Sequence, residues 1–276
     1  MEHKARARLL RGLAVEERRI EVNGIGTTVL EGGDGPPLLL LHGGIECGGV
    51  YWAPVISRLA QDHRLIVPDA PGLGESEPDR EGFTDWMSAL LRLTCEEPPT
   101  LVGHSLLGTL ALRFAADHGD RLRRLVIYAA PGVGPYRMPI GLRAVAIRFA
   151  LRPSEANMVR FERWAFADLD RVRRLDPDWL DAFTAYTRSR ALVPHVKRTM
   201  RQLVATGTKQ VRERIDVPTT LLWGAQDRFV PLDLAATASK RLGWPLKVID
   251  DAGHVPHIEQ PDAFVHALEE ATRTRS

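Results

Sequence analysis

The chain has 276 residues, 44% of them hydrophobic, and a formal net charge of +2. This length and apolar content predict one sizeable core, formed by a single domain with an insertion. The near-neutral charge, without a basic run, argues against a nucleic-acid-binding protein, and no apolar window is long enough for a membrane span. Two cysteines exclude a disulfide framework and suit a reducing compartment, so we expect a cytoplasmic protein.

Short strand-like segments run through the chain, and helical patterns alternate with most of the later ones. This alternation is typical of a mostly parallel sheet covered by helices on both faces. Ligands of such sheets bind beyond the carboxyl ends of the strands. The expected strands are residues 19–22, 27–30, 38–41, 65–67, 100–102, 125–128, 219–222 and 246–249.

The strand pattern stops between residues 134 and 214, which predicts a helical cap inserted after the sixth strand. The core domain would then consist of residues 1–133 and 215–276. The cap is basic and the rest of the chain acidic, which either helps the cap to dock or steers an anionic substrate to the cleft. We expect cap helices over 142–151, 155–169, 179–190 and 195–205. One of them has an apolar face at helical spacing, made of Met158, Phe161, Ala165 and Leu169.

A nucleophile elbow is predicted in residues 100–108, where an apolar run leads through Gly103 to Ser105 and then into a helical stretch. A serine on such a tight strand-to-helix turn holds its hydroxyl clear of the sheet, and the next backbone N–H is free to bind an oxyanion. Gly103 lets the chain reverse without a Cβ clash. The simpler alternative is that Ser105 is only the N-cap of the helix.

Asp227 and His254 are the expected partners of Ser105, because each follows an expected strand and can reach the same sheet edge. A serine hydroxyl needs a base to take its proton, and a carboxylate fixes the tautomer of that imidazole. The three residues are therefore the predicted catalytic triad. Asp227 could instead cap a helix that begins near Pro231. His254 and His257 could form a metal pair, but no second ligand cluster supports a metal site.

Five motifs, in this order, resemble the α/β-hydrolase superfamily, specifically its lidded esterase and lactonase-like members. The resemblance covers roughly residues 17–133 and 215–272 and implies an α/β-hydrolase fold: an eight-stranded, mostly parallel sheet with helices on both faces and an inserted helical lid. The motifs are His42-Gly43-Gly44, residues 69–76, the elbow, residues 224–231 and residues 253–261. One residue departs from the family pattern: Leu107 stands where the family usually has glycine, with Gly108 one step later.

The resemblance also implies roles around the triad. The backbone N–H groups of Leu106 and of Gly44, or of Ile45 in place of Gly44, would form the oxyanion hole. His42 and His257 would hold loops. Apart from the resemblance, we expect His104, Trp164 and Val255 to line the substrate site, with packing inside the cap as the alternative for Trp164.

The expected reaction is attack by Ser105 on a small, largely apolar carboxylic ester or lactone, with no cofactor and no metal. Hydrolases of carbon–carbon bonds in ring-fission products are an alternative, although they usually have Asn before the serine and Trp after the histidine, where this chain has His104 and Val255. A cofactor-free perhydrolase of the haloperoxidase-like branch and a non-catalytic ligand receptor are further alternatives. The expected partner is the small-molecule substrate, not nucleic acid or a membrane, and a homodimer is left open.

Overall fold

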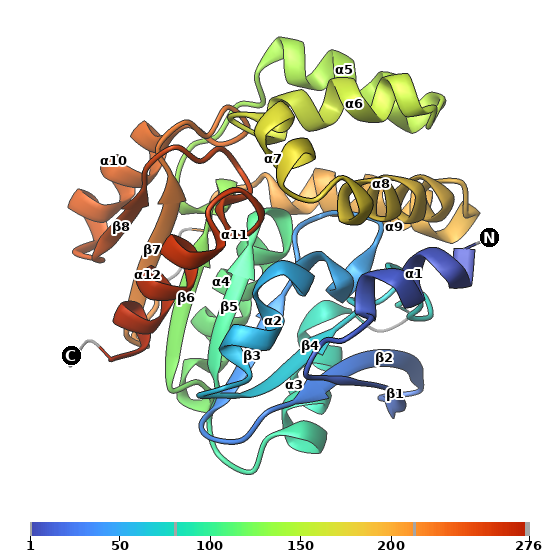
Figure 1. Cartoon of the computed structure of the whole chain (residues 1–276). Coiled ribbons are helices and arrows are strands. Elements are labelled where there is room, and N and C mark those ends of the chain that lie inside the picture. Colours follow the sequence, from blue (N-terminus) through green and yellow to red (C-terminus); the bar gives the residue numbers. More distant parts are fainter. Residues whose placement is uncertain (1, 80–81, 212–213, 274–276) are drawn as a thin grey trace.

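The computed structural model describes residues 2–79, 82–211 and 214–273, which contain an eight-stranded sheet (Figure 1). The strand order is β1-β2-β4-β3-β5-β6-β7-β8; the pairs β1–β2 and β2–β4 are antiparallel and the others parallel. All the expected strands are confirmed. Their bounds are Glu16–Val22 (β1), Ile25–Gly32 (β2), Pro37–Leu41 (β3), Arg64–Pro68 (β4), Thr100–His104 (β5), Arg124–Tyr128 (β6), Thr219–Gly224 (β7) and Leu246–Ile249 (β8).

Residue type explains which strands lie inside the sheet. Every residue of β3, β5 and β7 is buried, as expected for largely apolar parallel strands that are covered on both faces. The edge strand β1 instead begins with Glu and Arg side chains that are exposed. Charged side chains along an edge strand oppose pairing with another molecule.

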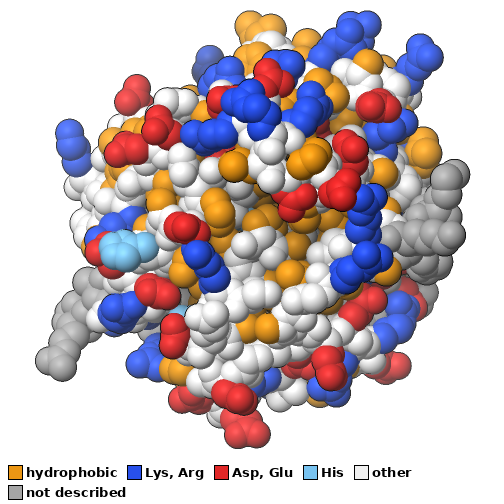
Figure 2. Space-filling model, viewed as in Figure 1, with side chains coloured by type: hydrophobic (Ala, Val, Ile, Leu, Met, Phe, Trp, Pro, Cys, Tyr) orange, Lys and Arg blue, Asp and Glu red, His pale blue; other side chains and the backbone are white. Residues whose placement is uncertain are grey.

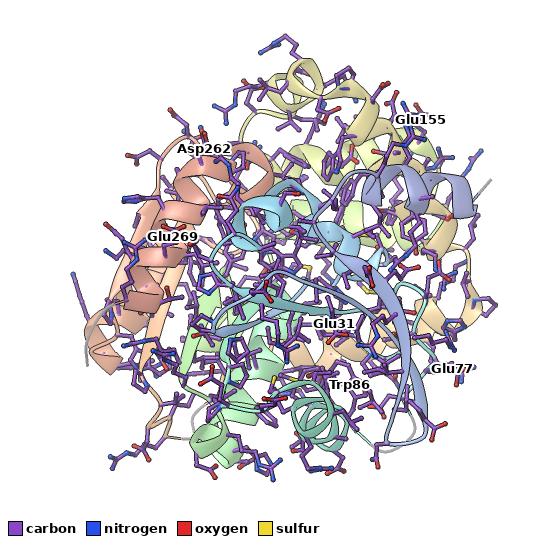
Figure 3. The ribbon with its side chains drawn as sticks, turned by 60° about the horizontal axis from the view of Figure 1, so that its bottom comes forward. Glu31, Glu77, Trp86, Glu155, Asp262 and Glu269 are labelled. Atoms are coloured by element: carbon purple, nitrogen blue, oxygen red, sulfur yellow. The ribbon has the colours of Figure 1, made fainter. Side chains whose placement is uncertain are left out.

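Helices cover both faces of the sheet: α2 contacts α12 on one face, and α3 contacts α4 on the other (Figure 1). Trp86 of α3 lies beneath the strands, fully buried, and its indole N–H donates to the Thr27 hydroxyl of β2 at 3.1 Å (Figure 3). The core helices are α1 (Glu2–Leu10), α2 (Ala53–Leu59), α3 (Phe83–Thr94), α4 (Ser105–His118), α10 (Leu232–Leu242), α11 (Pro256–Glu259) and α12 (Pro261–Arg273). Short 3-10 helices span Gly48–Trp52, Gly119–Arg121 and Pro131–Val133.

A group of helices, α5–α9, follows β6 in the sequence and lies above the carboxyl ends of the strands (Figure 1). We call α5–α9 the cap helices. Among the described residues, no helix has both the length and the apolar content needed to span a membrane. The cap helices are α5 (Ile140–Leu151), α6 (Glu155–Ala165), α7 (Leu169–Leu175), α8 (Pro177–Ala191) and α9 (Pro194–Gly207).

The single helix expected over residues 155–169 is wrong, because the chain leaves α6 at Ala165 and forms the separate helix α7. The backbone N–H groups of Ala167 and Asp168 donate instead to Glu259 Oε1, at 2.7 and 3.2 Å. Asp168 also caps α7 by accepting the Arg171 N–H at 2.8 Å. Glu259 lies far along the sequence, so helical periodicity could not reveal this break.

The basic charge of the cap lies on its outer surface, where Lys and Arg side chains gather at the top of Figure 2. Some of these side chains pair within the cap, as Arg163 does with Asp170 at 3.6 Å. Arg8 of α1 pairs with Asp178 of α8 at 2.8 Å and so joins the core to the cap. Such exposed pairs each contribute only about 0–1 kcal/mol, so they add little to the docking of the cap.

The strand order indicates where in the sheet a ligand-binding site is expected. β3 lies between β4 and β5, so the succession of strands reverses at β3. Parallel sheets bind ligands in the crevice outside the carboxyl ends of the strands at such a reversal. The turn after β3 carries Gly43 and Gly44, and the turn after β5 carries Ser105.

Candidate active site

The turn between β5 and α4 holds Ser105 in a left-handed backbone conformation, with a φ of 52°. For a residue other than glycine this conformation costs about 1–3 kcal/mol, and it persists only where the surrounding packing enforces it. Ser105 is the first residue of α4 and lines a cavity. The strained strand-to-helix turn expected from the sequence is therefore present.

Gly108 gives α4 its close approach to β5. A Cβ atom on Gly108 would lie 2.6 Å from the Gly103 carbonyl oxygen and 2.9 Å from Ala130 Cβ. Leu107, at the position where the family usually has glycine, is instead buried in the core and 1% exposed. The turn accommodates this leucine because the tight contact between helix and strand falls one residue later.

A chain of hydrogen bonds joins the three residues of the predicted triad. His254 Nε2 lies 3.0 Å from Ser105 Oγ, and His254 Nδ1 lies 2.8 Å from Asp227 Oδ2. With its proton on Nδ1, the imidazole donates to the carboxylate, and Nε2 can accept the serine proton. The residues come from the loops after β5, β7 and β8, which the fold brings together.

Backbone N–H groups fix the orientation of the Asp227 carboxylate. Oδ1 accepts from Phe229 at 2.8 Å and from Val230 at 2.9 Å, so Oδ2 is the oxygen that faces His254. The Asp227 side chain has no exposed surface. Both N–H groups precede α10, whose N-cap Pro231 receives no side-chain hydrogen bond, so Asp227 holds its own loop and does not cap the helix.

The cap helices hold the loop that carries His254. The His254 N–H donates to the carbonyl oxygen of Ala165, the last residue of α6, at 2.7 Å. Glu259, 2% exposed, accepts the Gly253 N–H on Oε2 at 2.6 Å and the N–H groups of the α6–α7 link on Oε1. This carboxyl group thus ties the loop after β8 to the cap.

Buried neutral histidines surround the triad. His42 Nε2 accepts a backbone N–H from the loop after β4 at 3.0 Å, and His257 lies between the Tyr128 hydroxyl (3.1 Å) and the Tyr51 carbonyl oxygen (3.2 Å). Burial lowers the pKa of His42 to about 4 and that of His257 to about 3. The pKa of His104 also falls well below its usual value, first because the ring is buried and then because other histidines lie nearby.

The metal-pair alternative finds no support in these contacts. The ring nitrogens of His254 face Ser105 and Asp227, and those of His257 face Tyr128 and Tyr51. Within residues 2–79, 82–211 and 214–273, no group of three or more His, Cys, Asp or Glu side chains could hold a metal ion.

Gly44 and Leu106, the expected oxyanion donors, pack against each other. A Cβ atom on Gly44 would lie 2.5 Å from Leu106 Cδ1. The Ile45 N–H donates to the Gly43 carbonyl oxygen at 2.7 Å, which favours Gly44 over Ile45 as the second donor. On the cap side, a Cβ atom on Gly207 would lie 2.9 Å from Leu106 Cβ, so α9 covers this residue closely.

A cavity opens at Ser105 between the cap helices and the core. Its cap wall consists of Met158, Phe161, Glu162, Ala165, Phe166 and Phe183. Its core wall consists of Gly43, Gly44, Ile45, Tyr51, His104, Ser105, Phe229, His254, Val255 and Ile258. Among the described residues, the lining includes no Lys or Arg, and Glu162 is its one carboxyl group. The cavity therefore suits a largely apolar molecule.

His104 and Val255, two of the expected substrate-binding residues, line this cavity, but Trp164 does not. The Trp164 ring packs on α5, where a Cβ atom on Gly141 would lie 2.6 Å from Trp164 Cζ2. Helix α6 turns Phe161 and Ala165 toward the cavity and Trp164 to the side. The expected role of Trp164 is therefore corrected to packing between two cap helices.

The sequence reasoning missed Glu162 and Phe229, which also line the cavity. Phe229 stacks obliquely on the His254 ring, with centroids 4.7 Å apart. For Glu162 a signal existed, because it lies on the same helical face as Phe161 and Ala165. A charged residue on an apolar helix face is a position that requires explanation.

A family model of the alpha/beta hydrolase fold matches residues 36–261 of the chain. The chain belongs to the α/β-hydrolase family. Over 267 residues, covering 90% of each chain, this α/β-hydrolase is 28% identical to a 2-hydroxymuconate semialdehyde hydrolase of Pseudomonas sp. (strain CF600). Over 266 residues, covering 86% of this chain and 75% of the relative, it is 30% identical to an uncharacterised protein of Mycobacterium tuberculosis (strain ATCC 25618 / H37Rv).

Among solved structures, this α/β-hydrolase is similar to a 2-hydroxy-6-oxo-6-phenylhexa-2,4-dienoate hydrolase from Rhodococcus sp. strain RHA1. The TM-score is 0.82 and the sequence identity 22%, with 95% of this chain and 100% of that chain covered. At this identity the likeness supports the fold and carries no substrate assignment.

We predict that Gly108→Ala lowers both the melting temperature and turnover, because the new methyl group would push α4 away from β5 and shift Ser105. Gly119→Ala is the matched control, since its Cβ atom would meet nothing closer than 3.7 Å. Thermal unfolding and ester turnover of both variants provide the measurement. If the two variants behave alike, the close approach at Gly108 does not hold the turn.

The free energy of unfolding should fall as the pH drops from about 6.5 toward 4. Histidines of the unfolded chain take up protons in this range, whereas folded His42 and His257 stay neutral because their pKa values are about 4 and 3. Each contributes up to about 1.4 kcal/mol per pH unit. Urea unfolding between pH 5 and about pH 7 should therefore give a shallower pH slope for His257→Gln than for the wild type. Identical slopes would show that His257 is not held neutral.

Proposed function

We propose that this α/β-hydrolase is a serine hydrolase that cleaves a carboxylic ester or lactone of a small, largely apolar substrate. The observation that carries the proposal is the hydrogen-bond chain from Asp227 through His254 to Ser105, which ends in an apolar cavity. A positioned base gives a serine hydroxyl the nucleophilicity that it otherwise lacks.

In the proposed reaction, Ser105 Oγ attacks the carbonyl carbon and its proton passes to His254 Nε2, 3.0 Å away. The carbonyl oxygen becomes an oxyanion, which the N–H groups of Leu106 and Gly44 would bind. When the tetrahedral intermediate collapses, the imidazolium gives its proton to the leaving alcohol. Water, deprotonated by His254, then releases the acid from the acyl-enzyme, while Asp227 stabilises the imidazolium in both steps.

Hydrolysis of a carbon–carbon bond is the second candidate, favoured by the 28% identity to a 2-hydroxymuconate semialdehyde hydrolase over 90% of both chains. Two observations favour ester cleavage instead. His104 and Val255 occupy the positions beside the serine and the histidine where ring-fission hydrolases usually have Asn and Trp. A dienoate substrate is an anion, yet the described cavity wall has a carboxyl group, Glu162, and no Lys or Arg.

We predict turnover of p-nitrophenyl acetate and butyrate and little turnover of a ring-fission dienoate. Ser105→Ala should reduce ester turnover by about 10⁴-fold or more, because no other described group replaces the nucleophile. Its melting temperature should stay close to that of the wild type, since alanine adds no atoms to the turn. Steady-state kinetics and thermal unfolding test these expectations.

Two outcomes would contradict this proposal. Faster turnover of the dienoate than of every ester would establish the carbon–carbon bond hydrolase. Ester turnover that survives in Ser105→Ala would mean that Ser105 is not the nucleophile.

Asp227→Asn should fold normally but lose roughly 10²–10⁴-fold in kcat, because the amide favours the wrong imidazole tautomer. The two backbone hydrogen bonds to Oδ1 can still form with the amide oxygen, so thermal unfolding should change little. A variant that unfolds while activity per folded molecule is unchanged would restrict Asp227 to a structural role.

A further inference from the structure

Glu162 places a carboxyl group inside an otherwise apolar cap wall. It lies on α6 with Met158, Phe161 and Ala165, and the three- and four-residue spacing of these positions forms one helix face that lines the cavity. Glu162 is only 2% exposed. By contrast Glu155, at the start of the same helix, projects outward with 77% of its side chain exposed (Figure 3).

Only one of the two Glu162 carboxyl oxygens has a partner. Oε1 accepts the Thr184 hydroxyl of α8 at 2.8 Å. Oε2 is fully buried and has no hydrogen-bond partner among the described residues. An unpaired polar atom in an apolar cavity is costly, so this oxygen is a ready hydrogen-bonding group for a molecule that enters the cavity.

The surroundings of Glu162 disfavour a full negative charge. Burial raises the pKa of the carboxyl group, and the acidic side chains of Asp181 and Glu155 act in the same direction. Thr184 and the charge of Arg173 act in the opposite direction without overcoming the burial. No Lys or Arg of the described cavity lining offers a counter-charge.

We infer that Glu162 is a specificity residue that recognises an uncharged hydroxyl group on the substrate. A hydroxyl can donate to a carboxylate and accept from a carboxylic acid, so it pairs with Oε2 in either protonation state. A substrate carboxylate would meet a carboxyl group without a cation. The other α6 residues at the cavity are apolar, so the substrate class is an alkyl or aryl ester that carries one hydroxyl group away from the reacting carbonyl. This inference rests on the proposed ester hydrolysis at Ser105.

The test compares p-nitrophenyl esters of ω-hydroxy acids of several chain lengths with their methyl isosteres. At the chain length that reaches Glu162, the wild type should favour the hydroxy ester by about 10-fold or more in kcat/KM. Glu162→Leu should abolish this preference and should improve turnover of the methyl isostere relative to the hydroxy ester. If Glu162→Leu does not fold, Glu162→Met, unbranched and apolar, takes its place.

Two variants control for structural effects. Thr184→Val removes the same contact between α6 and α8 but keeps the carboxyl group, and Glu155→Gln changes an exposed glutamate of the same helix. Both should keep the hydroxyl preference within about 3-fold of the wild type. A preference lost equally in Thr184→Val and Glu162→Leu would reduce Glu162 to a cap contact and overturn the inference.

The remaining outcomes separate this inference from the proposed function. Ser105-dependent turnover with equal kcat/KM for hydroxy and methyl esters at every chain length overturns the inference alone. A stronger preference for ω-amino esters than for hydroxy esters overturns the hydroxyl assignment, because it requires an ionised Glu162. Absence of ester turnover, or turnover that survives in Ser105→Ala, contradicts the proposed function itself.

Discussion

The left-handed backbone at Ser105 is the constraint on which the rest of the site depends. It turns the chain from β5 into α4 within one residue and directs the hydroxyl into the cavity. The conformation is costly, so neighbouring parts of the protein must enforce it. Gly108 lets α4 lie against Gly103, and Gly207 brings α9 onto Leu106 from the cap side. The turn is therefore held by the core and by the cap together.

The cap is also hydrogen-bonded to the loop that carries His254, the base of the triad. The His254 N–H donates to the end of α6, and Glu259 bridges Gly253 and the α6–α7 link. The hydrogen bond that positions His254 toward Ser105 thus depends on a loop that the cap itself holds. Because of these bonds, movement of the α6–α7 link would disturb the base of the triad as well as the entrance to the cavity.

The chemistry of the cavity follows from which buried groups stay uncharged. Burial holds His42, His104 and His257 neutral, so none of these three rings adds a positive charge near the triad. Phe161 and Phe229 stack edge to face on each other and join the cap wall to the core wall. The specificity role inferred for Glu162 depends on these apolar surroundings, because no Lys or Arg of the described cavity wall compensates for its carboxyl group.

The sequence by itself determined what depends on local pattern. The apolar runs fixed the eight strands, and glycine before Ser105 indicated the turn, since tight turns restrict residue type locally. Asp227 and His254 could be chosen because each follows a strand at the same sheet edge.

Only the tertiary structure decided two further points. The close contact between helix and strand falls at Gly108 and not at position 107, and only some of the cap residues face the cavity. Glu259 breaks the expected helix at Ala165, Trp164 turns toward α5, and Glu162 turns toward the cavity. These outcomes depend on contacts between residues that are distant in the sequence, which periodicity along one segment cannot contain.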